Sequence, residues 1–177
     1  MHSIDLSVQQ FLSMSRTPAM TEFWFIFTTL FNVSLHFIVV IGCVAALVYL
    51  FRGFKYAFLF LFSLTGGSIL VYVLKTSFDV NRPVDAVIHE ASKSFPSGHA
   101  TIATIFFGML MFIFDRYFSR IGRIIFNSCC IAMILAVSFS RIYLGEHWLS
   151  DVLGGMVLGT FVCYVSIFLF RKAYPRI

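Results

Sequence analysis

Residues 140–170 read SRIYLGEHWLSDVLGGMVLGTFVCYVSIFLF, a polar stretch followed by a long apolar one, and this succession decides the fold. The charge-free run at 152–170 approaches the ~20 residues that a helix needs to cross ~30 Å of hydrocarbon. A membrane-spanning β-strand would instead show ~10 residues of alternating polarity. Backbone N–H and C=O groups must be paired inside lipid, so the run is predicted to be a transmembrane helix.

The rest of the chain repeats this apolar pattern. Further charge-free runs occupy 23–51, 56–74, 100–114 and 124–140. Of the 177 residues, 59% are apolar and only 12% are charged, and the mean hydropathy is +0.91, whereas roughly a quarter of the residues in a soluble domain are charged. We therefore expect an all-α integral membrane helical bundle with about five transmembrane helices, forming a single domain over 1–177.

The run at 23–51 is longer than one crossing requires, since a single helix of this length would measure about 43 Å. We expect a break at Asn32 and Ser34, leaving 19–31 as an interfacial or partly buried helix and 33–51 as the crossing. Upstream, apolar residues are mixed with polar ones, which indicates an amphipathic segment at the membrane surface. The prediction is an interfacial N-terminal segment at 1–31 and a transmembrane core with the site at 33–171.

The cations that lie apart from the motifs described below gather on one side of the predicted bundle, and by the positive-inside rule that side is cytoplasmic. The loops 76–97 and 142–150 then face the periplasm or outside of a bacterial-type inner membrane, and the C-terminus is cytoplasmic. The net charge of +5 follows from this topology, so no nucleic-acid partner is expected. These cations are Arg52, Lys55, Arg116, Arg120, Arg123, Arg171, Lys172 and Arg176.

Three other cations, Lys75, Arg82 and Arg141, border the opposite, outer side. Like charges held together repel one another, so without an equal number of acids they need an anion between them. A phosphoryl group meets this requirement, because arginine offers planar pairs of donors to its oxygens and lysine a compact charge.

Ser97-Gly98-His99 precedes the apolar run at 100–114 and is predicted to open its helix. The free N–H groups of a helix N-terminus bind anions, and Gly98 lets the backbone approach an oxyanion closely. His99 is placed to give a proton to a leaving oxygen. This segment therefore adds donors to the predicted phosphate site.

His147 and Asp151 are four residues apart, which predicts one helical face with the carboxylate hydrogen-bonded to an imidazole nitrogen. The other ring nitrogen would then be oriented as a nucleophile toward phosphorus. A phosphohistidine that water hydrolyses, with His99 switching from acid to base, completes the cycle. No metal and no cofactor are required.

Together these stretches resemble the signature of the type 2 phosphatidic acid phosphatase (PAP2) superfamily, K-x6-R-P, P-S-G-H and S-R-x5-H-x3-D, over residues from about 55 to 170. The resemblance implies a metal-independent helical-bundle phosphatase with His147 as nucleophile, His99 as acid and base, and Asp151 orienting His147. It also implies that Lys75, Arg82, Ser97, Gly98 and Arg141 hold the phosphate. The matching residues are Lys75, Arg82, Pro83, Pro96, Ser97, Gly98, His99, Ser140, Arg141, His147 and Asp151.

The expected activity is removal of a phosphate from a lipid phosphate monoester or pyrophosphate, with membrane lipids as surroundings. Candidate substrates are undecaprenyl diphosphate, phosphatidylglycerol phosphate, phosphatidic acid and diacylglycerol pyrophosphate; the short outer loops favour a polyprenyl diphosphate. Alternatives are a phosphotransferase with an acceptor other than water, a non-catalytic lipid-phosphate binding protein, and a non-catalytic transporter. A transporter would have charges through the depth of several helices, whereas these lie at one membrane face.

Two further features of the last motif carry expectations. Glu146, directly before His147, would either repel a dianion or hold a group of the substrate, and the sequence leaves both readings open. Gly155 and Gly159 form a small-xxx-small pair, which predicts close packing of their helix against a neighbour.

Overall fold

The fold was obtained as a computed structural model that describes residues 2–31, 35–88 and 92–175. Within these ranges the chain forms helices and no strand, which confirms the all-α prediction. The helices are α1 (His2–Met14), α2 (Pro18–Thr29), α3 (Leu35–Arg52), α4 (Phe54–Ser77), α5 (Gly98–Phe114), α6 (Arg120–Tyr143) and α7 (Leu149–Ala173).

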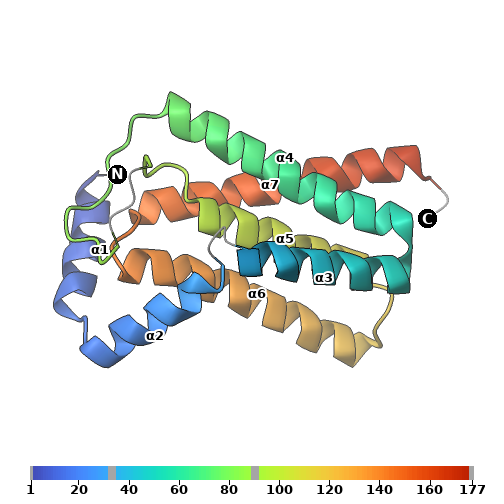
Figure 1. The fold of residues 1–177 in the computed structure, drawn as a ribbon, viewed down its shortest axis with the longest axis horizontal. Helices are drawn as coiled ribbons and strands as arrows, with labels where there is room; N and C mark the ends of the chain where they lie inside the picture. The colour runs from blue at the N-terminus through green and yellow to red at the C-terminus, as the bar shows by residue number, and fades with distance from the viewer. Residues whose placement is uncertain (1, 32–34, 89–91, 176–177) are drawn as a thin grey trace.

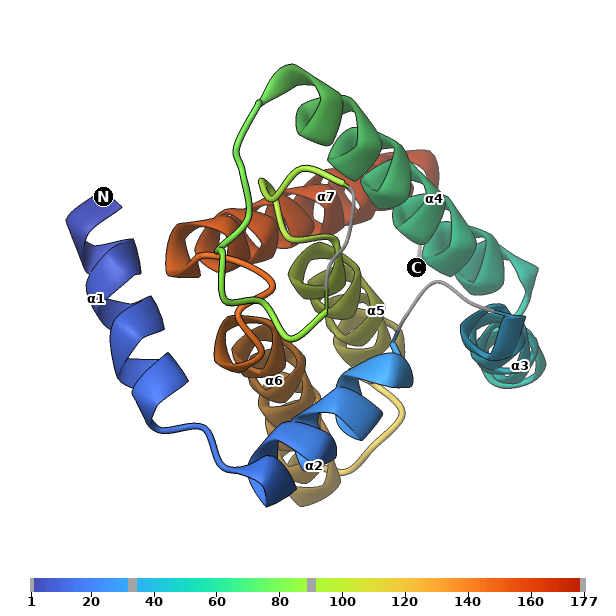
Figure 2. The ribbon, with the colours of Figure 1, turned by 60° about the vertical axis from the view of Figure 1, so that its left-hand side comes forward.

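Helix α5 is the centre of the bundle and contacts α4, α6 and α7, while α3 packs along α4 (Figures 1 and 2). The core along α5 includes the fully buried Phe60, Ile105 and Met109, whereas large apolar side chains such as Leu50 and Val157 point outward. An apolar exterior of this kind suits a lipid solvent, in which helices associate through van der Waals packing and hydrogen bonds.

Glycines bring α7 against α5, as the spacing of the small residues predicted. A Cβ atom added to Gly155 would lie 2.6 Å from the carbonyl oxygen of Ser97, and one added to Gly159 would lie 2.7 Å from Cβ of Thr104. Any larger residue would therefore push the two helices apart. This close contact sets the distance between the first turns of α5 and α7, which carry two of the three motifs.

By length and composition, α4, α6 and α7 are apolar enough to cross a membrane, and the described helices also include the shorter apolar segments His36–Arg52 and Gly98–Phe114. These five helices are the ones that the sequence predicted to cross. The count of five crossings stays a prediction, because two of the helices are shorter than a full span.

At the N-terminus, α1 stands across the end of the bundle and α2 runs along α6 (Figure 1). In α1, Asp5 and Gln9 are buried against the protein, and the partly buried Val8 packs inward beside them, while Ile4 and Phe11 are exposed. Exposed apolar side chains on a short helix of mixed polarity are suited to the membrane surface, as predicted for this segment. The predicted break at Asn32 and Ser34 lies outside the described residues, and the division of the domain at that point stays a prediction.

Hydrogen bonds attach α1 to the segments that carry the last motif. The Asp5 carboxylate accepts the backbone N–H of Ser150 at 2.9 Å and its hydroxyl at 2.8 Å, which satisfies a free donor at the start of α7. Following α1, Arg16 donates through Nε to the carbonyl oxygen of Tyr143 at 2.8 Å. The N-terminal segment thus holds both sides of the turn that joins α6 to α7.

Candidate active site

The three motifs converge at the end of the bundle where α1 lies. Lys75 is in the last turn of α4, Arg82 in the following loop, and Arg141 in the last turn of α6. Ser97 precedes the first residue of α5, as predicted, and its backbone N–H donates to the carbonyl oxygen of Asp151 at 3.1 Å. The predicted site residues brought together here are Lys75, Arg82, Ser97, Gly98, His99, Arg141, His147 and Asp151.

A serine completes the link between the imidazole and the carboxylate. Nδ1 of His147 lies 3.3 Å from Oγ of Ser94 and 3.6 Å from Oδ2 of Asp151. The Ser94 hydroxyl donates to that same carboxylate oxygen, so its own oxygen is left to accept the proton on Nδ1. On the far side of the ring, Nη1 of Arg82 donates to Nε2 at 3.4 Å. These partners assign the proton to Nδ1 and leave the lone pair on Nε2.

The expected common helical face of His147 and Asp151 is wrong in its geometry. Helix α7 begins only at Leu149, so His147 lies in the turn before it. Oδ2 of Asp151 accepts the backbone N–H of Trp148 at 2.9 Å, which fixes the carboxylate at the start of its own helix. His147 nevertheless approaches Asp151, because the turn that precedes α7 folds back over the N-terminus of that helix.

Burial lowers the pKa of His147 well below its ordinary value, because the charged ring would lose its hydration. The positive charges of Arg82, Arg141 and Lys75 lower the pKa further, and the hydrogen bond with Ser94 acts in the opposite direction. The imidazole is therefore neutral at physiological pH, which is the state a nucleophile requires.

The loop after α4 orients two of the cations. Arg82 donates through Nε to the carbonyl oxygen of Ser92 at 2.8 Å, through Nη2 to its hydroxyl at 2.9 Å, and through Nη1 to the carbonyl oxygen of Glu146 at 2.7 Å. The ammonium of Lys75 donates to the carbonyl oxygen of Lys93. Backbone carbonyl groups and the Ser92 hydroxyl thus position these cations beside His147.

The third cation, Arg141, forms a buried ion pair. Its Nη2 lies 2.9 Å from Oε2 of Glu146, and both side chains are completely buried. The same carboxylate oxygen is 3.6 Å from Nη1 of Arg82, and Nη1 of Arg141 donates to Oγ1 of Thr28 in α2 at 2.9 Å. Because a buried charge is costly unless it is paired, Glu146 stabilises two site arginines. The sequence left open whether Glu146 repels a dianion or holds a group of the substrate. In the structure its carboxylate contacts two arginines of the protein.

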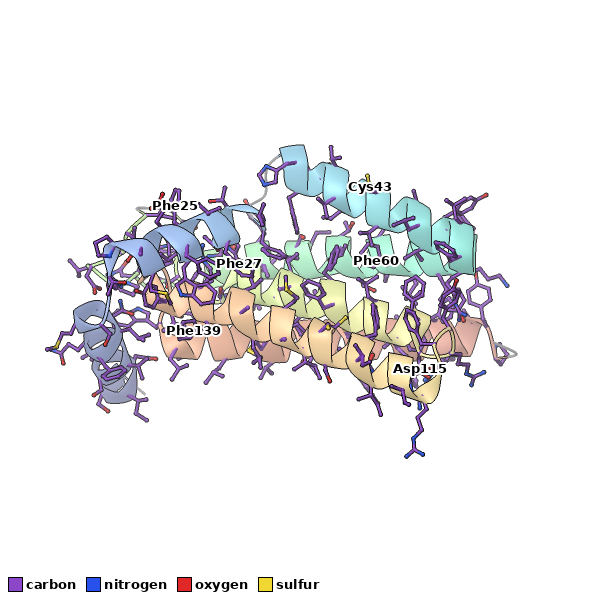
Figure 3. The ribbon with its side chains drawn as sticks, turned by 90° about the horizontal axis from the view of Figure 1, so that it is seen from below. Phe25, Phe27, Cys43, Phe60, Asp115 and Phe139 are labelled. Atoms are coloured by element: carbon purple, nitrogen blue, oxygen red, sulfur yellow. The ribbon has the colours of Figure 1, made fainter. Side chains whose placement is uncertain are left out.

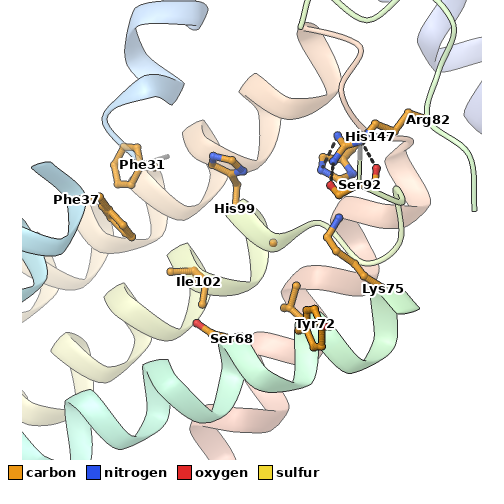
Figure 4. A pocket seen from close by; sticks show the side chains of 12 residues that line it. Phe31, Phe37, Ser68, Tyr72, Lys75, Arg82, Ser92, His99, Ile102 and His147 are labelled. Carbon is orange, nitrogen blue, oxygen red and sulfur yellow. Dashed lines mark hydrogen bonds between the residues drawn. The ribbon is translucent and has the colours of Figure 1, made fainter. Parts of the chain in front are cut away.

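A cavity of about 270 Å³ opens beside these groups (Figure 4). Lys75, Arg82, His99 and His147 line it together with the backbone of Gly98, and its other wall is apolar. Oγ of Ser97 is buried at this end and has no hydrogen-bond partner among the described residues. The cavity combines cationic donors with a surface suited to hydrocarbon, and the apolar residues include Phe31, Phe37, Val71 and Ile102.

Several of these contacts could not be anticipated from the motifs. Ser94 and Ser92 belong to an irregular loop, and Thr28 is 113 residues away from the arginine that it contacts. Ser94 lies only three residues before Ser97, and this closeness to the second motif is the one signal in the sequence that could have drawn attention to it.

The fold and the site together define a membrane-embedded helical protein with a neutral histidine among fixed cations. The family model of the PAP2 superfamily matches residues 56–175, about two thirds of the chain. The protein belongs to the PAP2 superfamily, as its motifs indicated, and it is an integral membrane protein.

Known proteins with related sequences are phosphatases by name. The chain is 34% identical over 100 residues to phosphatidylglycerophosphatase B of Bacillus subtilis (strain 168), covering 55% of this chain and 49% of that protein. It is 32% identical over 84 residues to lipid A 1-phosphatase of Rhizobium johnstonii, covering 48% and 31%. The matched part is thus less than half of the length of either relative.

The similarity to one solved structure extends over nearly the whole chain. The crystal structure of a transmembrane PAP2-type phosphatidylglycerolphosphate phosphatase from Bacillus subtilis superposes with a TM-score of 0.87 at 27% sequence identity. The superposition covers 97% of this chain and 86% of that one. The arrangement of helices described above is therefore also found in a solved member of the superfamily.

Proposed function

We propose that the protein is a membrane lipid phosphatase that hydrolyses a phosphate monoester or a pyrophosphate of a lipid through a phosphohistidine. The observation that carries this proposal is the Nδ1-protonated His147, linked through Ser94 to Asp151, in a cavity with cationic and apolar walls. The phosphatases named among the relatives, and the lipids in those names, support a lipid phosphate as substrate.

Binding in this proposal rests on charge and on the helix N-terminus. Lys75 and Arg82, which line the cavity, face the phosphoryl oxygens, and Arg141 adds positive charge from its buried position beside Glu146. The hydroxyl of Ser97 and the backbone at Gly98 supply neutral donors. The apolar wall receives the part of the lipid next to the headgroup, while the tail remains in the membrane. The substrate therefore does not have to leave the lipid phase before it reacts.

In the chemical steps, Nε2 of His147 forms a bond to phosphorus as the bond between phosphorus and the leaving oxygen breaks. His99, which lines the same cavity, protonates that oxygen. Water then attacks phosphorus and gives its proton to His99, and the bond between phosphorus and Nε2 breaks, which releases inorganic phosphate and restores the neutral imidazole. Ser94 and Asp151 stabilise the ring by holding the proton on Nδ1 throughout.

The proposed orientation places the site at the outer surface of a bacterial inner membrane and the C-terminus in the cytoplasm. Its support is the distribution of basic residues: Arg52, Lys55, Arg116 and Arg171 belong to helix ends or connections at the end of the bundle away from α1 (Figure 1). Arg176 lies outside the described residues. By the positive-inside rule, this basic end faces the cytoplasm.

The test is release of inorganic phosphate by the purified protein from undecaprenyl diphosphate, phosphatidylglycerol phosphate and phosphatidic acid in excess EDTA. We expect release from at least one lipid in the unaltered protein and none above background in His147→Ala. The matched control is His36→Ala, which changes a histidine of α3 that contacts the carbonyl oxygen of Thr29.

Two outcomes would contradict the proposal. Release that persists in His147→Ala would exclude this histidine as the nucleophile, and release that stops on chelation would require a metal-dependent mechanism. Transfer of the labelled phosphoryl group to an added alcohol without release of phosphate would favour the phosphotransferase instead.

A further inference from the structure

A second polar cavity, of about 390 Å³, lies at the end of the bundle opposite the histidines. It is bordered by the ends of α3, α5 and α7, by the first turn of α4 and by α6, and Asp115 marks this end in Figure 3. None of the residues that line it belongs to the three motifs. The lining residues with polar groups are Arg52, Tyr56, Asp115, Arg116, Asn127, Arg171 and Tyr174.

The lining carries an excess of positive charge. Its acid, Asp115, lies 3.5 Å from Nη1 of Arg123, which is not part of the lining. Among the described residues, no carboxylate lies within 4.0 Å of the guanidinium groups of Arg52, Arg116 or Arg171. Three arginines lie at this cavity with one acid, which is paired with a fourth arginine, so the arginines repel one another and the arrangement favours an anion between them.

Aromatic rings hold two of these arginines in place. Cζ of Arg52 lies 4.7 Å from the centroid of the Tyr56 ring, and Cζ of Arg171 lies 5.4 Å from that of Phe112. A cation over an aromatic face keeps its charge while losing freedom of motion. The guanidinium groups are therefore partly ordered before any ligand binds.

Two atoms at this cavity have unused hydrogen-bonding capacity. Nε of Arg52 and Oδ1 of Asn127 are buried, and neither has a hydrogen-bond partner in the described part of the chain. A buried donor or acceptor without a partner costs free energy. An anionic oxygen would satisfy the arginine N–H, and a hydroxyl group would satisfy the amide oxygen.

From these observations we propose that the cavity binds the headgroup of an anionic phospholipid, a phosphodiester bearing hydroxyl groups, in the leaflet opposite the active site. Basic pockets between membrane helices are known to bind acidic headgroups. Large apolar side chains stand exposed beside the cavity and offer a surface for the acyl chains, among them Leu50, Phe51 and Phe54. The occupant is therefore a lipid rather than a soluble phosphate.

The test measures, by native mass spectrometry, how much phosphatidylglycerol the purified protein retains, compared with phosphatidylcholine. The double variant Arg116→Gln/Arg171→Gln is expected to lose retention of phosphatidylglycerol about tenfold or more. The matched control, Arg120→Gln/Lys172→Gln, removes the same charge from exposed residues at the same end that do not line the cavity, and is expected to change retention less than twofold.

A second experiment distinguishes a lipid ligand from a free phosphate ester. It uses the unaltered protein, so its result does not depend on whether the variants fold. Soluble glycerol phosphate is expected not to displace phosphatidylglycerol, and high salt is expected to weaken retention. Equal loss in the two double variants, equal retention of both lipids, or displacement by glycerol phosphate would overturn the proposal.

Discussion

Ser94 lies between His147 and Asp151, and it illustrates how one hydroxyl determines the state of the nucleophile. In Ser94→Ala, the Nδ1 proton would face the carboxylate only across 3.6 Å. We expect kcat to fall about tenfold with little change in KM, because the lost hydrogen bond to a charged partner orients the ring rather than the substrate.

The control for this change is Ser92→Ala, since Ser92 uses its hydroxyl to hold Arg82 and belongs to the same loop. That variant should affect KM more than kcat. The idea of a histidine-orienting serine would be refuted by steady-state kinetics in which Ser94→Ala changed only KM.

Glu146 sets the charge of the phosphate site through its contacts with two arginines. In Glu146→Gln, the amide oxygen can still accept from Arg141, but one negative charge beside the site is lost. We expect inorganic phosphate to inhibit about tenfold more strongly or beyond, because two unit charges about 10 Å apart interact by about 1.7 kcal/mol at an effective dielectric constant near 20. The inhibition constant of phosphate is the measurement.

Thr28→Val provides the comparison, because it removes a different side-chain contact of Arg141 and leaves all charges unchanged. It should weaken inhibition by phosphate or leave it unaltered. Stronger inhibition in both variants would mean that loosening Arg141, rather than removing a charge, is responsible.

The pH profile depends on the lowered pKa of His147. Only the neutral ring attacks phosphorus, so kcat/KM should remain high as the pH falls to about 6.5, the ordinary imidazole value, and decline only below it. Lys75→Gln removes one of the positive charges that lower this pKa, so the acid limb should move to higher pH.

The substrate titrates in the same way with both proteins. The difference between their kcat/KM profiles therefore reports only the titration of groups on the enzyme. Identical acid limbs for the unaltered protein and Lys75→Gln would show that His147 does not control the profile.

At the scale of elements, the contact between α5 and α7 determines whether the motifs meet. Gly159→Ala places a methyl group 2.7 Å from Cβ of Thr104 and 2.8 Å from the carbonyl oxygen of Thr101. We expect the free energy of unfolding to fall by about 1–3 kcal/mol, with activity lost in parallel as the first turns separate. Thermal unfolding in detergent measures this effect.

Gly66→Ala in α4 is its matched control, because a Cβ at Gly66 would meet nothing within 4 Å. Alanine is favoured over glycine in a helix by about 1 kcal/mol, so this variant should be as stable as the unaltered protein or more so. Equal destabilisation in both would show that the effect does not come from the α5–α7 contact.

For the whole molecule, the two ends of the bundle differ in charge and in chemistry. One end has the histidines and α1, and the other has the basic connections and the C-terminus of α7 (Figure 1). We expect a reporter fused after the last residue to be active only in the cytoplasm. Activity of a periplasm-dependent reporter at that position would reverse the orientation and place the proposed site on the inner side.

The sequence by itself determined the class of fold, the family and the motif residues that are predicted to form the site. Charge-free runs of membrane length require helices whatever their neighbours are, and the spacing within each motif identifies the residues independently of their surroundings. It also predicted the packing of Gly155 and Gly159, because small residues repeat at helical spacing within a single element.

Only the tertiary structure decided how these residues act on one another. His147 meets Asp151 through a turn and through Ser94, Glu146 pairs with two arginines, and Thr28 of α2 contacts Arg141 across 113 residues of sequence. None of these contacts follows from helical periodicity, since they join irregular loops and separate helices. The charge and protonation state of the site depend on burial and on distances between elements, which exist only once the helices have packed.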